Sequence, residues 1–524
     1  MSKVSCMLIA LLLFSVSVPM RAQNLWDRPN TQLFSQQNYF GLPGTQLWGW
    51  LSDLPIASQQ LTIPSIPIGL LGWQKITGEK RNFSGVPDGI LGPNGAVSDR
   101  ENSYAWSAEF HGGYLYVGTT RDVIGLVVLM AGLDPSLLPD DVPTVTDLRG
   151  RIYRMKLSTG KWETFFDQTA PSTGIDMGYR YMKTYTAPRA KPVLYVGSSG
   201  LRSPSRLLAI DSQHNQPEAI FSAPGFSIRA IVEHNRQLFW ASEVNGYPKI
   251  WYGTDPLKEY HQNNDVEFAS IEVPGNWFRA DKGAEILDMV SWNNAIYVFF
   301  CNHDFADGGF WCAKLRQNRQ GAWNWELIVG DQVTLHARYP KGMGRMENGG
   351  ATPYVFKNKM YVGTISNTMW GFLMAGIYPD FNNLPATGIQ IFRFDKNDRW
   401  ERVMPSPLAT GTMETALNGF ANPLNLYLWR FVENDGKLYA GTFDARTALA
   451  GLGLQDDLNL WNPAGFDLYC TEDGKAWFPV SLDGFGDPFN YGVRVLKTNP
   501  DNGDLYLGTA NPFYGCQVWR KRAW

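Results

Sequence analysis

One phrase recurs along the whole chain and constrains the fold more than any other feature. It is an apolar run, a short polar turn and a second apolar run ending in Gly-Thr, as in FVENDGKLYAGT at residues 431–442. Asp-Gly and Asn-Gly pairs tolerate the positive φ that tight hairpin turns need. Versions of the phrase stand at residues 110–119, 192–198, 233–239, 292–298, 356–364, 431–442 and 502–509. We therefore expect seven copies of one β-hairpin unit.

Each copy extends to four short strands. A third strand is predicted at residues 150–155 and 388–393, and a fourth often starts on a tryptophan, as at Trp162 and Trp400. The last repeat stops after its third strand, residues 515–520. Residues 72–76, GWQKI, have the form of a fourth strand and precede the first repeat. Because an unpaired terminal edge is costly, we expect them to pair with the last strand and close a ring.

A four-stranded unit with a period of about 50 to 75 residues predicts an all-β fold. We expect one seven-bladed β-propeller of four-stranded blades over residues 73–524, closed by an N-terminal strand, with short helical insertions on one face. Aromatic residues at 14%, with 52 Gly and 32 Pro, fit many strands and turns. A net charge of -3 leaves no basic surplus for phosphates, so no nucleic acid is expected as a partner.

The N-terminal residues have a different composition. Residues 1–22 carry Lys3, an apolar run over 7–18 and a polar end, which is typical of a secretory signal peptide. Residues 23–72 are predicted to be a surface arm. The apolar run is too short for a comfortable membrane span, so no transmembrane span is expected in the mature chain. The predicted localisation is secreted or periplasmic.

Cysteine usage fits an oxidising compartment. Removal of the signal peptide leaves Cys301, Cys312, Cys470 and Cys516. The first two flank one hairpin loop, and we expect a disulfide between them. The other two lie on corresponding strands of successive repeats and form a second candidate pair. Buried free thiols are the alternative for both pairs.

Three apolar insertions interrupt the connection between the second and third strands of a repeat, at residues 121–149, 367–387 and 444–464. In a propeller these connections share one face, so the insertions are expected to gather there as short helices. They form either a recognition surface for a small molecule, glycan or protein, or a cap over the mouth of the ring. The candidate binding residues here are Leu129, Trp370, Phe372, Asp444 and Arg446.

An arginine recurs in the first strands of the repeats, as Arg180, Arg229, Arg430 and Arg494. One interpretation is a ring of positive charge around the channel for an anionic ligand such as a carboxylate or a sulfated glycan. In the other interpretation, each guanidinium lies between two blades and donates hydrogen bonds to carbonyls of the neighbouring blade. The recurrence of the arginine with the repeat favours this interpretation.

The most polar of the loops between second and third strands is CNHDFADGG at residues 301–309. Its side chains His303, Asp304 and Asp307 could hold a divalent cation such as calcium or act in acid–base chemistry. The alternative is a solvated turn.

One turn resembles a known motif. TEDGKAW at residues 471–477 resembles the Asp-box of sialidase-like propellers, with one residue fewer between Asp473 and Gly474. The Leu-Tyr-Val-Gly-Thr phrases are similar to those of bacterial secreted propellers of the kelch, Asp-box and related groups. This resemblance implies an architecture and a stabilised turn between third and fourth strands. The arginine triad, tyrosine nucleophile and paired acids of a sialidase have no counterparts in the sequence.

Two functions follow from these patterns. The first is a secreted or periplasmic propeller that binds a ligand or protein partner on its insertion-bearing face. The alternative is a propeller enzyme, a hydrolase or lyase, that acts on an extracellular glycan or a lipophilic ester or lactone at the channel mouth. The sequence does not decide between binding and catalysis, because one fold supports both.

Overall fold

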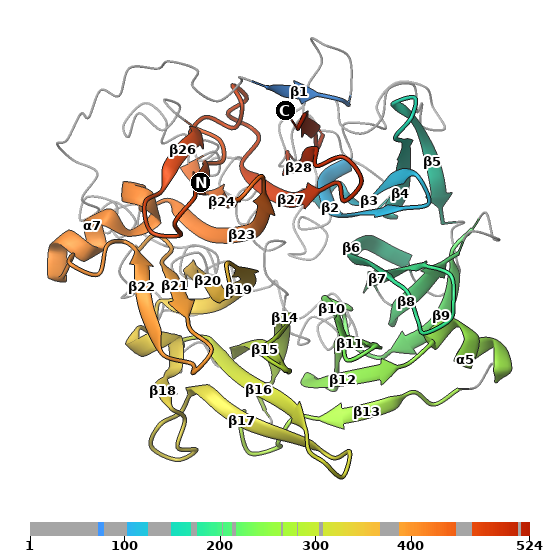
Figure 1. Ribbon diagram of the computed structural model, residues 1–524, viewed down its shortest axis with the longest axis horizontal. Helices are drawn as coiled ribbons and strands as arrows, with labels where there is room; N and C mark the ends of the chain where they lie inside the picture. The colour runs from blue at the N-terminus through green and yellow to red at the C-terminus, as the bar shows by residue number, and fades with distance from the viewer. Residues whose placement is uncertain are drawn as a thin grey trace, which may run out of the picture.

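The computed structural model describes residues 72–77, 102–123, 148–168, 175–201, 203–211, 216–263, 266–279, 281–302, 308–366, 387–446, 464–511 and 515–523. Strands that follow one another in the chain pair antiparallel in sets of four. The sets are arranged around a common centre, which their first strands face (Figure 1). The predicted signal peptide and nearly all of the predicted surface arm lie outside the described residues.

The first three sets comprise β2 (Asn102–His111), β3 (Tyr114–Arg121), β4 (Arg151–Lys156) and β5 (Lys161–Asp167); β6 (Ile175–Tyr185), β7 (Val193–Leu201), β8 (Ser205–Ile210) and β9 (Glu218–Ala223); and β10 (Ala230–His234), β11 (Gln237–Val244), β12 (Tyr247–Gly253) and β13 (Ala269–Glu272). The next three comprise β14 (Ala284–Trp292), β15 (Ala295–Asn302), β16 (Trp311–Gln317) and β17 (Trp323–Gly330); β19 (Asn348–Phe356), β20 (Lys359–Ser366), β21 (Ile391–Phe394) and β22 (Trp400–Met404); and β23 (Asn425–Asn434), β24 (Lys437–Asp444), β25 (Leu468–Thr471) and β26 (Phe478–Ser481). A short strand, β18 (Tyr339–Pro340), adds parallel to β17.

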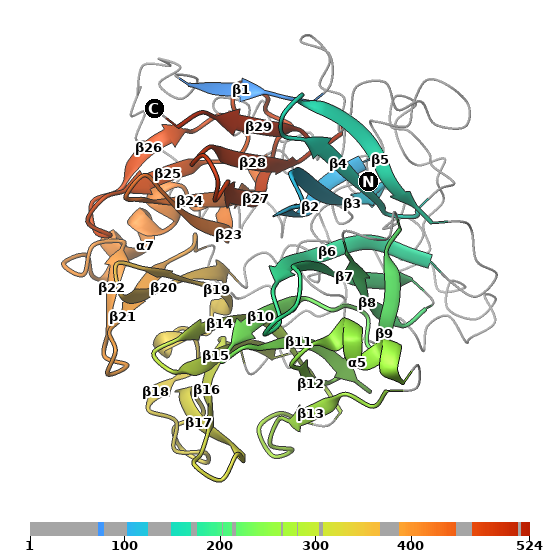
Figure 2. The same ribbon diagram turned by 45° about the vertical axis from the view of Figure 1, so that its right-hand side comes forward.

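The last set joins the two ends of the described chain. It comprises β27 (Gly492–Thr498), β28 (Leu505–Ala510), β29 (Val518–Lys521) and β1 (Trp73–Lys75). In the β1–β29 pair, Trp73 lies opposite Lys521 and Lys75 lies opposite Trp519. Figure 2 shows these two strands side by side. The predicted pairing of residues 72–76 with the last strand is therefore present.

Neighbouring sets are held by few ladder bonds and by many apolar contacts. Single residue pairs such as Thr120 with Gly178 and Phe443 with Gly492 link several sets into one 20-stranded sheet. The strands β10–β13 and β14–β18 form separate sheets, so the hydrogen-bonded ladder does not close into a ring. Buried side chains bridge those two sheets, as where Phe239 and Phe300 share one core cluster.

The recurring glycine of the Gly-Thr phrase is required by close packing between sets. A Cβ atom on Gly118 would lie 2.6 Å from Cβ of Tyr179, and one on Gly508 would lie 2.8 Å from Cβ of Ala105. The predicted hairpin turns also have the backbone they need, because φ is 49° at Asp435 and 70° at Gly436. The sequence repeat thus reflects both the turn and the interface between sets.

Two helices that the sequence patterns did not predict lie among the described residues. The first, α5 (Pro256–Gln262), follows β12, and its N-cap Asp255 accepts a hydrogen bond from the backbone of Lys258 at 3.4 Å. The second, α7 (Gly411–Ala421), connects β22 to β23. The insertions that were expected to be helical fall largely outside the described residues. No helix in the described part of the chain is long and apolar enough to cross a membrane.

The predicted disulfide between Cys301 and Cys312 is wrong, because the structure has both as free, buried thiols. The β15–β16 register explains this result. Cys312 lies opposite Phe299, two positions from Cys301. Such diagonal neighbours have Cα atoms roughly 7–8 Å apart, beyond the ~5.5 Å that a disulfide favours. Cys470 and Cys516 are free thiols as well.

Candidate functional site

The first strands of the sets line a central cavity of about 1080 Å³. Its walls come from β2, β6, β10, β14, β19, β23 and β27. The lining extends from the buried Arg180 and Arg494 to hairpin-turn residues such as Asn235 and Asn294. These turns lie at the opposite end of the first strands from the connections that carry the apolar insertions. The described cavity therefore reaches the face opposite the one on which the sequence patterns located binding.

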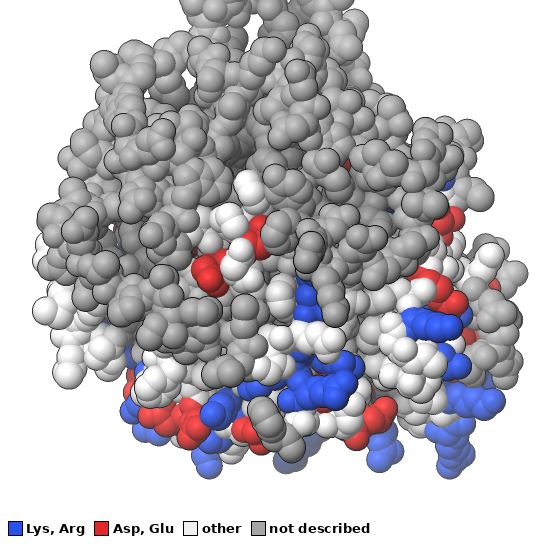
Figure 3. All heavy atoms as spheres, turned by 90° about the horizontal axis from the view of Figure 1, so that it is seen from above, with Lys and Arg blue, Asp and Glu red and all other residues white. Residues whose placement is uncertain are grey.

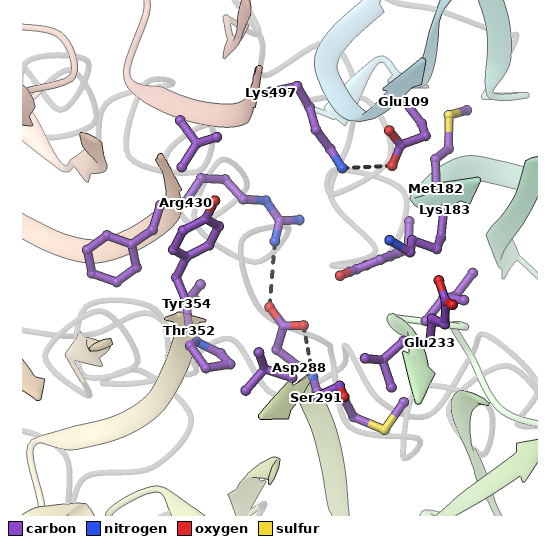
Figure 4. Close-up of a pocket in the computed structure, with 18 of the residues that line it drawn as sticks. Glu109, Met182, Lys183, Glu233, Asp288, Ser291, Thr352, Tyr354, Arg430 and Lys497 are labelled. Atoms are coloured by element: carbon purple, nitrogen blue, oxygen red, sulfur yellow. Dashed lines mark hydrogen bonds and ion pairs between the residues drawn. The ribbon is translucent and has the colours of Figure 1, made fainter. Parts of the chain in front are cut away.

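The cavity lining carries more positive than negative charge. The charged lining residues are Arg180, Lys183, Arg430, Arg494, Lys497, Glu109, Glu233 and Asp288. Lys497 Nζ lies 2.8 Å from Glu109 Oε2, and Arg430 Nη1 lies 3.7 Å from Asp288 Oδ2 (Figure 4). On the described part of the face seen in Figure 3, acidic and basic side chains lie side by side. The cavity lining itself has five basic and three acidic side chains.

Asp288 is the buried acid of this lining. Burial raises its pKa to about 6, and the attraction of Arg430 partly opposes that shift. Its Oδ1 accepts a hydrogen bond from the backbone N–H of Met289 at 2.9 Å. A modest fall in pH therefore neutralises a negative charge on the cavity wall.

Arg229 has a different role from the other recurring arginines. Its Nη1 donates to both carboxylate oxygens of Glu285, at 3.0 and 3.1 Å, and its Nη2 donates to the Tyr427 hydroxyl at 3.2 Å. Arg229 immediately precedes β10, whereas Tyr427 belongs to β23, and these strands lie on opposite sides of the centre (Figure 1). Arg229 therefore forms a buried tie across the centre of the molecule.

Arg430 makes one contact of the kind expected for an arginine that lies between blades, a hydrogen bond to a carbonyl of the neighbouring set. Its Nε donates to the backbone carbonyl of Arg494 at 3.0 Å, and its Nη1 approaches Asp288. The four arginines considered in the sequence thus divide by environment. Arg229 and Arg430 have protein partners, whereas Arg180 and Arg494 form no hydrogen bond or ion pair through their side chains with another described residue.

Arg180 and Arg494 both occupy β-bulges. The β6–β7 register passes from Tyr179 to Tyr181 and skips Arg180, and the β27–β28 register skips Arg494 in the same way. The equivalent bulge residue is Trp106 in β2 and Trp429 in β23. A bulge changes the direction of the side chain it carries and is common beside functional sites.

These four bulge residues stack on one another, and we call them the arginine–indole stack: Trp106, Arg180, Trp429 and Arg494. The Arg180 guanidinium lies 5.0 Å from the Trp106 ring centroid. The Arg494 guanidinium lies 5.7 Å from the Trp106 ring and 4.5 Å from the Trp429 ring. Guanidinium groups and indole rings therefore alternate along neighbouring first strands, and each ring attracts the cation beside it.

Asp444 and Arg446 form a separate polar cluster. Asp444 Oδ1 accepts a hydrogen bond from the Arg446 backbone N–H at 2.7 Å, and the two side chains form an ion pair. Asp467, which the sequence patterns did not identify, lies 3.7 Å from Arg446 Nη2. Burial raises the pKa of Asp467 to about 7, with Arg446 opposing the shift and Asp444 adding to it.

A sequence signal for Asp467 did exist. Gln390 and Gln517 take its place before the third strands of other repeats. Each glutamine accepts a hydrogen bond from an asparagine, as Asp467 does from Asn425 at 2.6 Å. An acid in a position that two other repeats fill with glutamine is the unusual feature of this cluster.

The remaining candidate residues cannot be placed. Leu129, Trp370 and Phe372, and the candidate metal ligands His303, Asp304 and Asp307, lie outside the described residues. Within the described ranges there is no group of three or more His, Cys, Asp or Glu side chains suited to a metal ion.

The turn that resembles an Asp-box is well bonded. The Thr471 hydroxyl lies 3.0 Å from Asp473 Oδ1, which also accepts from the backbone N–H groups of Lys475 and Ala476 at 2.8 Å. The turn connects β25 to β26, a third and a fourth strand. Its position at the edge of a set, away from the cavity lining, indicates a structural role.

Sets of four antiparallel strands around a centre define a β-propeller, and the described strands of this chain have that arrangement. The propeller domain of the trilobed protease of Pyrococcus furiosus is similar over 79% of this chain and 93% of that one, with 8% identity and a TM-score of 0.38. The GH74 xyloglucanase of Xanthomonas campestris matches 85% of this chain at 13% identity and a TM-score of 0.45. A prolyl endopeptidase matches 80% of it at 11% identity and a TM-score of 0.41.

This chain covers 53% of the xyloglucanase and 51% of the prolyl endopeptidase. No protein-family model matches the sequence. A search of curated proteins finds no match either. Likenesses at this level say nothing of the chemistry of this chain.

Proposed function

We propose that this chain is an exported, closed, seven-bladed β-propeller that binds an anionic ligand in its central cavity. The main support for this proposal is the cavity lining, which contains five cationic side chains and three carboxylates. Burial raises the pKa of one of those carboxylates, Asp288, to about 6, so a fraction of this carboxyl is protonated and uncharged just below neutral pH. A volume of about 1080 Å³ is large enough for a ligand of a few hundred daltons.

The seven blades and their closure are supported by the pairing of β1 with β29, which gives the last set its fourth strand. Export is supported by residues 1–22, whose pattern is that of a signal peptide. Mass spectrometry of the protein recovered from the producing cells tests export. Recovery of the intact leader from the cytoplasm alone would contradict it.

The binding proposal is tested by calorimetric titration with citrate, glucuronate and a sulfated disaccharide against neutral and cationic analogues. We expect at least one anion to bind and its neutral analogue to fail. Lys183→Gln and Lys497→Gln should each weaken binding several-fold, because each removes a lining cation. Lys161→Gln, on the exposed face of the outer strand β5, is the matched control. Equal binding of neutral and anionic analogues would refute the proposal.

The insertion-bearing face is the alternative location for a ligand or partner. Substituting Leu129, Phe372 or Leu452 by Ser distinguishes the two locations. If the cavity is the site, affinity for the anion stays unchanged in these variants. If the insertions form the recognition surface, affinity falls while the melting temperature hardly moves. If they only cap the ring, stability falls by about 2 kcal/mol or more for each variant.

A hydrolase is the second candidate, and Asp467 is the observation that favours it. Its carboxyl is 2% exposed, its Oδ1 has no hydrogen-bond partner among the described residues, and its pKa is raised to about 7. An acid with such a pKa is suited to proton transfer near neutral pH. The test is a screen of glycosidic and ester substrates. Any activity found should be lost in Asp467→Asn, and activity that survives this change would exclude Asp467 as the acid.

A further inference from the structure

The arginine–indole stack presents hydrogen-bond donors without acceptors. Arg180 Nη2, Arg494 Nε, Trp106 Nε1 and Trp429 Nε1 are buried and have no hydrogen-bond partner among the described residues. Arg180 and Arg494 are only 4% and 5% exposed, and both line the central cavity. A buried donor without an acceptor costs roughly 1–3 kcal/mol, and more when it is charged. The two guanidinium donors are charged and line the cavity, so they are the ones that call for an explanation.

The nearby carboxylates are bonded elsewhere. Both oxygens of Glu285 accept from Arg229, and Asp288 is held by Arg430 and by the Met289 backbone. Glu243 Oε1 accepts from the backbone N–H of Phe226 at 3.3 Å. The stack is thus a cationic region, and the carboxylates near it form hydrogen bonds or ion pairs with other groups.

Electrostatics makes the stack unfavourable while it lacks an anion. Burial, followed by the repulsion of Arg229, lowers the pKa of Arg180 well below its usual value. Burial, followed by the repulsion of Arg430, lowers the pKa of Arg494 to about 9. With a pKa of about 9, Arg494 keeps its charge at neutral pH, so burying that charge lowers the stability of the fold. A bound anion would relieve this cost.

The stack is reachable from the wider part of the cavity. Lys183 and Lys497 follow Arg180 and Arg494 by three residues on the same strands, which corresponds to about 10 Å along a strand. These lysines lie nearer the hairpin turns and can attract an anion toward the arginines. Arginine forks and indole N–H groups are donors that match oxygen atoms of a carboxylate, sulfate or phosphate.

We propose that the arginine–indole stack binds the oxyanion head group of the ligand, a carboxylate, sulfate or phosphate held by Arg180 and Arg494 and bounded by Trp106 and Trp429. This inference rests on the proposed function and adds to it the location and chemistry of recognition. The remainder of the ligand extends along the cavity toward Lys183 and Lys497.

The test is titration of the full chain with sodium sulfate, sodium phosphate, acetate and glucuronate at constant ionic strength. Affinity for the best anion should fall at least tenfold in Arg180→Gln and in Arg494→Gln. In Trp429→Phe, which keeps an aromatic ring but removes its N–H, affinity should fall several-fold. Arg316→Gln, at an exposed position of β16, is the matched control and should bind normally. Preference for glucuronate over the inorganic ions would identify a sugar-acid head group, and the reverse would identify a free ion.

Thermal unfolding gives a second measurement that separates binding from a structural role. Without anion, Arg494→Gln should melt at or above the wild-type temperature, because an uncompensated buried charge is removed. With saturating anion, only the wild type should gain stability. A glutamine variant that fails to fold in either condition contradicts the proposal, since it assigns the arginine to the fold. Unchanged binding in Trp429→Phe contradicts it as well.

The failures of the two proposals are distinguishable. If no anion binds the wild type, the proposed function and this inference both fall. If Lys183→Gln and Lys497→Gln lose binding while Arg180→Gln and Arg494→Gln retain it, the cavity binds anions and the stack is not their site.

Discussion

Arg229 and Arg494 occupy equivalent positions in the repeat and have opposite surroundings. Each immediately precedes the residue that pairs with the glycine position of the recurring phrase. Ala230 lies opposite Ala241, and Val495 lies opposite Gly508. Arg229 meets the carboxylate of Glu285, whereas Arg494 meets three aromatic rings. Position in the repeat therefore determines where an arginine lies, and the residues of the neighbouring sets determine what it binds.

The tie between Arg229 and Glu285 should be important for stability. Glu285→Ala removes the carboxylate that holds a buried guanidinium, so the free energy of unfolding should fall by about 3–5 kcal/mol. Urea denaturation measures the change. Glu163→Gln disturbs the more exposed pair with Arg154 and should cost at most about 1 kcal/mol. A loss below 1 kcal/mol in Glu285→Ala would show that the tie is dispensable.

Asp288 should make anion binding depend on pH. Its pKa of about 6 means that it is charged at pH 7.5 and largely neutral at pH 5.5; the basic groups that act on it are Arg430, Arg229 and Lys497. Lowering the pH removes a negative charge from the cavity wall, so anion affinity should rise between these values. Titration at both values measures this effect. Asp288→Asn should bind tightly at both, and a pH dependence that survives the substitution would exclude Asp288 as its source.

At the scale of the element, the sequence predicted the hairpins well because their turns are local. The Asp435-Gly436 turn is determined by the φ angles its residues tolerate. The helix α5 could also have been predicted, because Asp255 and Pro256 are a typical N-cap and first helical residue. It was missed because a single short helix does not recur with the repeat. The β-bulges could not be predicted from the sequence. A bulge adds one unpaired residue to a strand, and in a strand that is buried along its length this leaves the apolar pattern unchanged.

The bulges explain why aligning the repeats by their arginines was misleading. Arg430 follows the bulge residue Trp429, whereas Arg180 and Arg494 are themselves bulge residues. The shift of one position moves Arg430 to Asp288 and leaves Trp429 in the stack. Only the strand register distinguishes these positions, and register depends on contacts between strands.

The strand β1 should contribute substantially to stability for its length. Trp73 is 7% exposed and packs on Phe485, with ring centroids 5.1 Å apart. Trp73→Ala should therefore lower the free energy of unfolding by about 3–5 kcal/mol, as measured by denaturant titration. Gln74→Ala removes only an exposed hydrogen bond from Arg520 and should lower it by at most about 1 kcal/mol. Equal effects would mean that β1 adds no packing of its own.

At the scale of the whole molecule, the cavity could not be located from the sequence. Its lining combines residues of seven strands from β2 to β27, and the tie from Arg229 to Tyr427 spans 198 positions. The sequence did identify Arg180, Arg430 and Arg494, because a charged residue within an otherwise apolar strand is conspicuous. Their partners depend on how the sets are placed around the centre, which the local pattern does not contain.

If the ring is closed as proposed, it should unfold as one cooperative unit. Each set contacts two neighbours, so losing one set exposes two interfaces. Differential scanning calorimetry should give a single transition with calorimetric and van't Hoff enthalpies in agreement. Trp73→Ala should shift that transition to lower temperature without dividing it. Two resolved transitions in the wild type would indicate that the sets unfold as independent groups, as in open repeat arrays.

The union of β1 with β29 has a consequence for biosynthesis. The hydrogen bond from Arg520 to Gln74 joins residues 446 positions apart. At ordinary elongation rates of about 5–20 residues per second, β1 waits roughly 20 to 90 s for its partner strand to be made. During that interval its backbone edge and the indole of Trp73 have no native neighbour. The last set therefore assembles only after nearly all of the chain has been made.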